Sequence, residues 1–145
     1  MSRGIEGRTT PAVSLQFDRA DRRYEPGDWI AARYRIDGLG EEPIEAIEAI
    51  EHSVLWYTEG KGEEDMGVHF FERVAAGRGA TAADGAVAFR ARLPASPLSY
   101  EGVIVKIRWC ARVRIFFRTA RDFVSEHVFE VGRLPPARMD ALKSS

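Results

Sequence analysis

A row of basic side chains in the second half of the chain is the feature whose residue types and spacing most clearly permit chemistry. Residues 103–121 carry six basic and no acidic side chains. Five of the six fall at even positions, and a two-residue period places side chains on one face of a β-strand. These five are Lys106, Arg108, Arg112, Arg114 and Arg118. Guanidinium groups in such a row suit bidentate hydrogen bonds to carboxylate or phosphate, so these residues are candidate binding residues.

The same pattern has a second explanation that needs no ligand. Residues 41–72 carry ten acidic side chains against one lysine. A strand from this segment beside the basic row would pair the opposite charges across the sheet. The row is therefore either a binding surface or a solvated face neutralised by neighbouring glutamates, and the acidic segment favours the second explanation.

The other reactive residue types show no catalytic or metal-binding spacing. His52, His69 and His127 fall on three different expected strands, and no GxSxG, P-loop or GxGxxG motif accompanies them. Cys110 is the sole cysteine and lies among apolar residues at a strand centre, as a small buried hydrophobe does. The acidic run 63–65 lacks the spacing and the glycine of a calcium loop. We expect no enzyme activity, no metal site and no cofactor.

The composition is that of one ordinary soluble domain. The 145 residues are 45% hydrophobic and 30% charged, with a formal net charge of −1, and a chain of this length can hold a core without disulfides. Balanced charge argues against a nucleic-acid partner, because such domains are usually basic. One cysteine and the absence of a visible signal sequence or transmembrane segment indicate a cytoplasmic protein. The use of 18 arginines and three lysines is typical of a GC-rich bacterial genome.

Alternation of apolar and polar residues predicts a chain built from β-strands. The alternation runs through 13–18, 29–36, 68–74, 86–93, 103–118 and 123–131. Proline and glycine mark the turns, as in Tyr24-Glu25-Pro26-Gly27-Asp28. We expect a flexible arm at 1–12, one domain at 13–134 and a tail at 135–145. The tryptophans are expected to pack in the core or between sheets, and they are Trp29, Trp56 and Trp109.

Residues 44–58 fit two kinds of secondary structure. Isoleucines recur every three residues at Ile44, Ile47 and Ile50, which favours a helix over 44–52. The β-branched and aromatic run that follows at 54–57 is typical of a strand. We predict a strand, because strand patterns lie on both sides and a lone helix would need its own surface to cover.

The pattern at 103–118 is the longest in the chain. Sixteen residues of period two cannot form an amphipathic helix. At roughly 3.3 Å per residue the strand would be about 50 Å long, so we expect a bend or bulge near its middle. Strands at this spacing, with turn residues between them and no crossover helix, predict an all-β antiparallel sandwich of seven or eight strands.

Four short motifs occur in a fixed order along the chain. They are Tyr24-Glu25-Pro26-Gly27-Asp28, Ser99-Tyr100-Glu101-Gly102 after a proline-bounded loop, Ile107-Arg108-Trp109-Cys110-Ala111-Arg112-Val113, and a last hairpin strand ending Phe129-Glu130-Val131. This ordered set resembles the N-terminal domain of arrestin-like proteins. That family includes visual and β-arrestins, α-arrestins, the arrestin-like subunit of retromer and bacterial sporulation-control relatives. The resemblance covers roughly residues 13–134 and implies an immunoglobulin-like sandwich that acts as a non-enzymatic adaptor.

The resemblance also implies how partners would be bound. Family analogy matches the basic row to acidic or phosphorylated segments of a partner protein, and an exposed sheet edge can accept a partner strand. Arrestins carry two such sandwiches whereas this chain holds one, so we expect no interdomain switch within a monomer. The alternative function is a structural subunit that self-assembles or packs into a larger complex. A local basic patch also permits peripheral contact with anionic lipids.

Overall fold

The computed structural model describes residues 11–37, 47–62, 64–75, 86–118 and 121–134. Within these ranges the chain forms ten strands and no helix, so the all-β prediction is confirmed. In chain order they are β1 (Ala12–Phe17), β2 (Arg23–Tyr24), β3 (Trp29–Asp37), β4 (Ile47–Gly60), β5 (Met66–Ala75), β6 (Val87–Arg92), β7 (Ser99–Glu101), β8 (Val105–Phe117), β9 (Phe123–Val131) and β10 (Arg133–Leu134).

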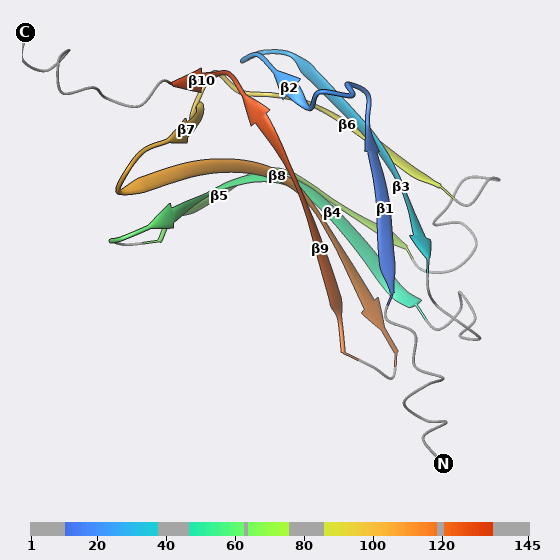
Figure 1. Cartoon of the computed structure of the whole chain (residues 1–145). Helices are drawn as coiled ribbons and strands as arrows, with labels where there is room; N and C mark the ends of the chain where they lie inside the picture. The colour runs from blue at the N-terminus through green and yellow to red at the C-terminus, as the bar shows by residue number, and fades with distance from the viewer. Residues whose placement is uncertain (1–10, 38–46, 63, 76–85, 119–120, 135–145) are drawn as a thin grey trace, which may run out of the picture.

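The strands form two sheets that face each other, as Figure 1 shows. The smaller sheet has the antiparallel order β1-β3-β6. The larger sheet has the order β10-β7-β8-β4-β5, and β9 pairs with β8 beyond the end of β7. Only the short pairs β2 with β9 and β10 with β7 are parallel among the described strands. The predicted sandwich of mostly antiparallel strands is confirmed.

Seven long strands correspond to the seven stretches predicted from the sequence. The three additional strands, β2, β7 and β10, are two or three residues long and lie in segments expected to be turns or loops. The arm and the tail fall almost entirely outside the described residues, although Ala12 already belongs to β1. Their flexibility and the domain boundaries stay predictions.

The ambiguous stretch is a strand, as predicted, from Ile47 onward; residues 44–46 lie outside the described ranges. β4 lies between β8 and β5 in the larger sheet. Its register with β8 shifts between Ile47 and Ala49. This irregularity explains why Ile47 and Ile50, three residues apart, are both buried in the core. A helix-like spacing is thus accommodated by a strand with a local irregularity.

The long strand β8 curves without a bulge in its middle. Its ladder to β4 is unbroken from Val105 to Phe116, and Figure 1 shows a smooth arc. Strand twist and coiling supply this curvature. Of the two predicted alternatives for this strand, the structure shows the bend and not the bulge. A bulge that was not predicted lies between β4 and β5, where Val54 pairs with Phe70 and Leu55 pairs with Val68, leaving His69 as the extra residue.

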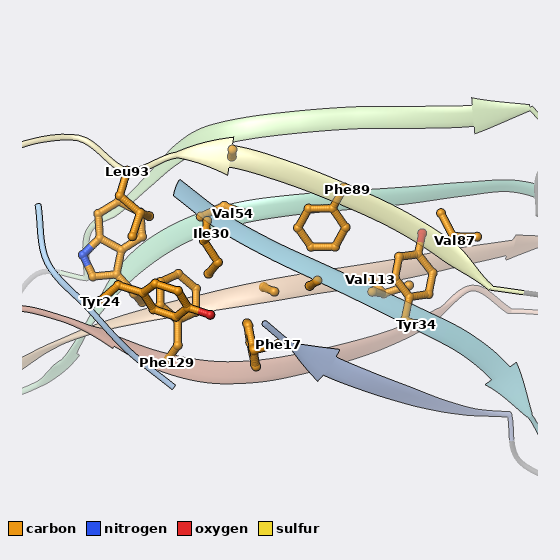
Figure 2. Close-up of a cluster of buried hydrophobic side chains, with 14 of the residues drawn as sticks. Phe17, Tyr24, Ile30, Tyr34, Val54, Val87, Phe89, Leu93, Val113 and Phe129 are labelled. Carbon is orange, nitrogen blue, oxygen red and sulfur yellow. The ribbon is translucent and has the colours of Figure 1, made fainter. Parts of the chain in front are cut away.

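One apolar core fills the space between the sheets (Figure 2). Aromatic rings from separate elements meet there, since Phe129 lies 5.5 Å from Phe17 and 5.7 Å from Tyr24, measured between ring centroids. Trp109 is fully buried and donates its indole N–H to the Pro97 carbonyl at 2.8 Å. The core therefore confirms the packing role expected for this tryptophan.

The turn before β3 determines which residues face the core. Gly27 has a φ of 86°, a conformation that glycine adopts without strain, and Asp28 N donates to the Glu25 carbonyl at 3.0 Å. β3 then starts with Trp29 facing outward and Ile30 facing the core. The expectation that Trp29 packs inside is wrong, because it shares the outward phase of Arg33 and is half exposed.

Candidate interaction surfaces

The basic row lies on the outer face of the larger sheet, where most of its members pair with carboxylates. Arg108 Nε lies 2.7 Å from Glu59 Oε1 on β4, and Arg108 Nη1 lies 3.1 Å from Glu101 Oε1 on β7. Lys106 Nζ lies 3.6 Å from the other oxygen of Glu101. The basic row on β8 thus forms ion pairs with the neighbouring strands on both sides, β4 and β7.

The second half of the row pairs with the hairpin that follows it. Arg112 Nε donates to Glu126 Oε2 on β9 at 2.8 Å, and Arg114 Nε donates to Asp122 Oδ2 at 2.7 Å. The hydrogen bond from Arg114 holds the pKa of Asp122 below its ordinary value. The ionised carboxylate is therefore favoured, and the face is neutralised locally.

The prediction that glutamates of the acidic segment 41–72 neutralise the basic row is only partly confirmed. Of the four partners, Glu59 alone comes from the acidic segment 41–72; Glu101, Glu126 and Asp122 come from other elements. Arg118 follows the end of β8. The structure places Lys106, Arg108, Arg112 and Arg114 on one face as predicted, and leaves their role in binding a prediction.

An apolar row crosses the same outer face between these ion pairs. It consists of four side chains in register on β9, β8, β4 and β5: Val128, Cys110, Leu55 and Val68. Cys110 and Leu55 are fully buried, whereas Val68 at the edge is half exposed. Arg108 and Arg112 lie two residues to either side of Cys110 on this face, so their aliphatic stems border the row.

The apolar surface widens along β5. Phe71 faces outward opposite Ser53, and Met66 faces outward opposite Tyr57. Met66, Val68 and Phe71 are each between 51% and 55% exposed. Among the described strands, β5 pairs with β4 alone, so its other backbone edge has no strand partner there. We call these three side chains and this edge the β5 edge.

His69 lies on β5 where this strand comes next to the smaller sheet. It is the extra residue of the bulge, and its Nε2 lies 2.6 Å from the backbone carbonyl of Arg92 at the end of β6. Because a carbonyl only accepts, Nε2 carries the hydrogen. This contact ties the two sheets together on the side where β5 and β6 are the outermost strands.

The histidines lie on three strands, as predicted, and none forms a catalytic set in the described part of the chain. His127 Nε2 lies 2.7 Å from Ser125 Oγ on β9. Among the residues that the structure describes, no carboxylate is hydrogen-bonded to the other ring nitrogen, Nδ1, as a catalytic triad would require. Cys110 is buried as predicted, and burial raises the pKa of its thiol to about 12, which disfavours the nucleophilic thiolate.

The sequence did not reveal a polar chain that joins three strands and leads from the core to the surface at Glu72. Tyr34 on β3 contacts His52 on β4, and His52 in turn contacts Glu72 on β5. His52 also stacks on Phe89, with ring centroids 4.5 Å apart. Tyr34 and His52 are each 1% exposed, so no substrate reaches them and their role is packing. No local spacing signals this contact, since it depends on the pairing of sheets.

Within the described ranges, no group of three or more histidine, cysteine, aspartate or glutamate side chains is arranged to hold a metal ion. Those ranges also contain no helix that is long and apolar enough to cross a bilayer.

Comparison with known proteins identifies the fold. No protein-family model matches the chain, and no curated protein matches it. Among solved structures, the sporulation control protein Spo0M from Bacillus subtilis matches at a TM-score of 0.61 and 15% identity, over 84% of this chain and 49% of Spo0M. The chain thus spans about half the length of that protein. The expected likeness to bacterial sporulation-control proteins is confirmed at the level of fold.

Structures of a β-glucosidase from Listeria innocua also match. One, in complex with gluconolactone, matches at a TM-score of 0.36 and 16% identity, over 84% of this chain and 16% of the enzyme. A second, of the enzyme without a named ligand, matches at 0.35 and 17% identity. These values are too low to support any inference about activity.

Proposed function

We propose that this domain is a non-enzymatic protein-interaction domain that binds a partner protein along the β5 edge. The observation that carries the proposal is a ten-residue strand at the end of the larger sheet that exposes three large apolar side chains. The sandwich fold shared with Spo0M, which is described as a sporulation control protein, supports a regulatory role. Within the proposal the protein is bacterial and cytoplasmic.

The backbone of β5 supplies the first part of the binding energy. An edge strand presents N–H and C=O groups that a second strand can pair with, and such addition is a common mode of peptide recognition. β5 is longer than an average strand. A partner strand here would extend the larger sheet beyond β4 and β5.

The side chains of the β5 edge supply the second part. Met66, Val68 and Phe71 lie on one face and are half exposed, so a partner that covers them removes apolar surface from water. The buried pair Leu55 and Cys110 continues this apolar surface toward β9. The partner would therefore present apolar side chains to this face.

The basic row has a secondary role in this proposal. Because its arginines are paired with carboxylates, an acidic or phosphorylated segment would have to displace Glu59, Glu101, Glu126 or Asp122 before binding. Lys106, Arg108, Arg112, Arg114 and Arg118 would then act by exchanging ion-pair partners. An apolar strand needs no such exchange, which is why the β5 edge is the preferred site.

The same edge supports a second candidate function. Two copies of this chain can pair through β5, since an edge strand pairs with a like strand when no charge opposes it. Self-assembly of this kind would make the protein a structural subunit. Sedimentation of the purified protein over a wide concentration range separates the two functions, because only the second gives a dimer without another protein.

The proposal is tested by placing charge on the β5 edge. The double variant Val68→Lys and Phe71→Lys alters only exposed side chains, so the fold should persist, and circular dichroism checks it. The matched control is Val103→Lys and Val124→Lys, two exposed valines outside the apolar row. In cells that make the protein, the β5 variant should lose its complex with the partner protein and the control variant should retain it. Equal retention by both variants would contradict the proposal.

A further inference from the structure

The strand β5 carries an acidic side chain on the face opposite Phe71. Glu72 pairs in register with His52, whose side chain lies in the core, so Glu72 is on the core-facing side of the larger sheet. Its side chain is nevertheless 55% exposed, because β5 is the outermost described strand of that sheet. The two faces of β5 therefore differ: the outer face is apolar and the inner face is acidic.

Glu72 has one polar partner within the described ranges. Its Oε1 lies 2.7 Å from His52 Nε2. The neighbouring cation, Arg73, is on the outer face and is held there by Glu51, with Nη1 2.6 Å from Oε2. No lysine or arginine of the described residues therefore neutralises the Glu72 carboxylate.

Apolar side chains lie on both sides of this carboxylate. Phe70 and Val74 are two residues away on the same face of β5, and both pack partly buried against the core. The aliphatic stem of a lysine or an arginine can cover such apolar surface while its charged group reaches a carboxylate. The inner face of β5 thus matches a long basic side chain in both its apolar and its acidic parts.

A strand that pairs with β5 would necessarily cover Glu72. Side chains directly opposite each other in neighbouring strands have their Cβ atoms about 4.5–5.5 Å apart, and opposite charges at such positions stabilise the pair. Covering a carboxylate without a cation or a hydrogen-bond donor costs free energy. The residue opposite Glu72 therefore determines which strands can bind.

The charge near the start of β5 has the same sign. Residues 60–65 carry three acidic side chains and one lysine. Two of these acidic residues, Glu64 and Asp65, are exposed and directly precede the strand. Complementary charge steers association and suppresses wrong partners, so this end of β5 also favours a basic partner.

We propose that the partner strand carries a lysine or an arginine opposite Glu72 and apolar side chains on its other face, over Val68 and Phe71. This inference rests on the proposed function, because it specifies the partner of the same β5 edge. The apolar contacts supply affinity, and the ion pair with Glu72 selects the sequence and the register of the bound strand.

A second copy of this chain matches the inner face of β5 less well. Residues directly opposite in an antiparallel pair share one face of the sheet. On the face of Glu72, β5 offers Gly67, Phe70 and Val74, and none of these is a lysine or an arginine. Two copies paired through β5 would therefore leave both Glu72 carboxylates without a cation.

Titration with designed peptides, followed by nuclear magnetic resonance, tests this inference. The probe is a short peptide with valines on one face of the extended chain, threonines and one central lysine on the other, and Gly-Ser ends for solubility. Two matched peptides replace the lysine by glutamine or by glutamate. The lysine peptide should shift the backbone amide signals of β5. It should bind about threefold tighter than the glutamine peptide and about tenfold tighter than the glutamate peptide.

Two variants of the full chain identify the carboxylate that is responsible. Glu72→Gln keeps an oxygen that accepts from His52 Nε2, so the fold should persist, and this variant should lose the preference for lysine over glutamine. Glu126→Gln removes the same charge from β9 and should keep the preference. Raising the salt concentration should reduce the preference in the unaltered protein.

The possible failures are distinguishable. Equal binding of the lysine and glutamine peptides at β5 would overturn this inference and leave the proposed function in place, and so would an unchanged preference in Glu72→Gln. Absence of β5 shifts with every peptide would overturn both. A dimer of the protein that excludes the peptides from β5 would also overturn both, in favour of self-assembly.

Discussion

The hydroxyl oxygen of Tyr34 and Nδ1 of His52 lie 2.7 Å apart and join the two sheets inside the core. The other ring nitrogen of His52, Nε2, lies 2.7 Å from Glu72 Oε1. An ionised carboxylate only accepts, so Nε2 carries the hydrogen and Nδ1 accepts from the Tyr34 hydroxyl. Burial and the nearby charge of Glu72 raise the pKa of Tyr34, which keeps the phenol protonated as donor.

Removal of the Tyr34 hydroxyl should destabilise the protein. In Tyr34→Phe the ring remains but Nδ1 of the buried His52 loses its donor, and an unsatisfied buried polar atom costs about 1–3 kcal/mol. Urea unfolding followed by circular dichroism measures the change in the free energy of unfolding. A loss below about 0.5 kcal/mol would show that the hydrogen bond does not stabilise the sandwich.

Stability should depend on pH through His52. Burial lowers its pKa below 6.5, and the hydrogen bond and charge of Glu72 oppose this shift only in part. The unfolded chain therefore binds the proton more readily than the folded chain. The contribution of His52 to the free energy of unfolding should be level above pH 6.5 and should fall as the pH drops below it.

His127 contributes with the same sign, because burial and the charge of Arg22 lower its pKa. The variant His127→Asn isolates the contribution of His52. Urea unfolding of this variant at about pH 7.5 and about pH 5.5 should still show reduced stability at the lower pH. Equal stability at the two values would contradict the assignment of a neutral, buried His52.

The ion pair between Arg112 and Glu126 should add little stability. Both side chains are partly exposed, and pairs of this kind typically contribute about 0.2–1 kcal/mol. We expect Arg112→Gln and Glu126→Gln each to have small effects and the double-mutant cycle to give a coupling energy within that range. A coupling energy above about 2 kcal/mol would mean that this face is built for stability rather than for exchange of partners.

The long strands were predictable because burial of one face imposes a two-residue period. β8 shows this best, since Trp109, Ala111 and Val113 face the core while Arg112 and Arg114 face out. The short strands β2, β7 and β10 were missed, because two or three residues contain no period. Trp29 was misplaced because its size suggested the core, whereas the alternation of β3 directs it outward.

The sites were less predictable than the strands. The row at 106–114 followed from spacing alone, but its partners Glu101, Glu126 and Asp122 could be found only from register. The β5 edge required the strand order, since Val68 and Phe71 look like core residues in the sequence.

The β5 edge is tested most directly by site-specific photo-crosslinking in cells that make the protein. A photoreactive phenylalanine analogue at position 71 replaces a half-exposed side chain, and the same analogue at Val124 on β9 serves as the control. We predict a discrete adduct of one partner protein from position 71 and none from position 124. No adduct from position 71, equal adducts from both positions, or an adduct with twice the mass of this chain would contradict partner binding through this edge.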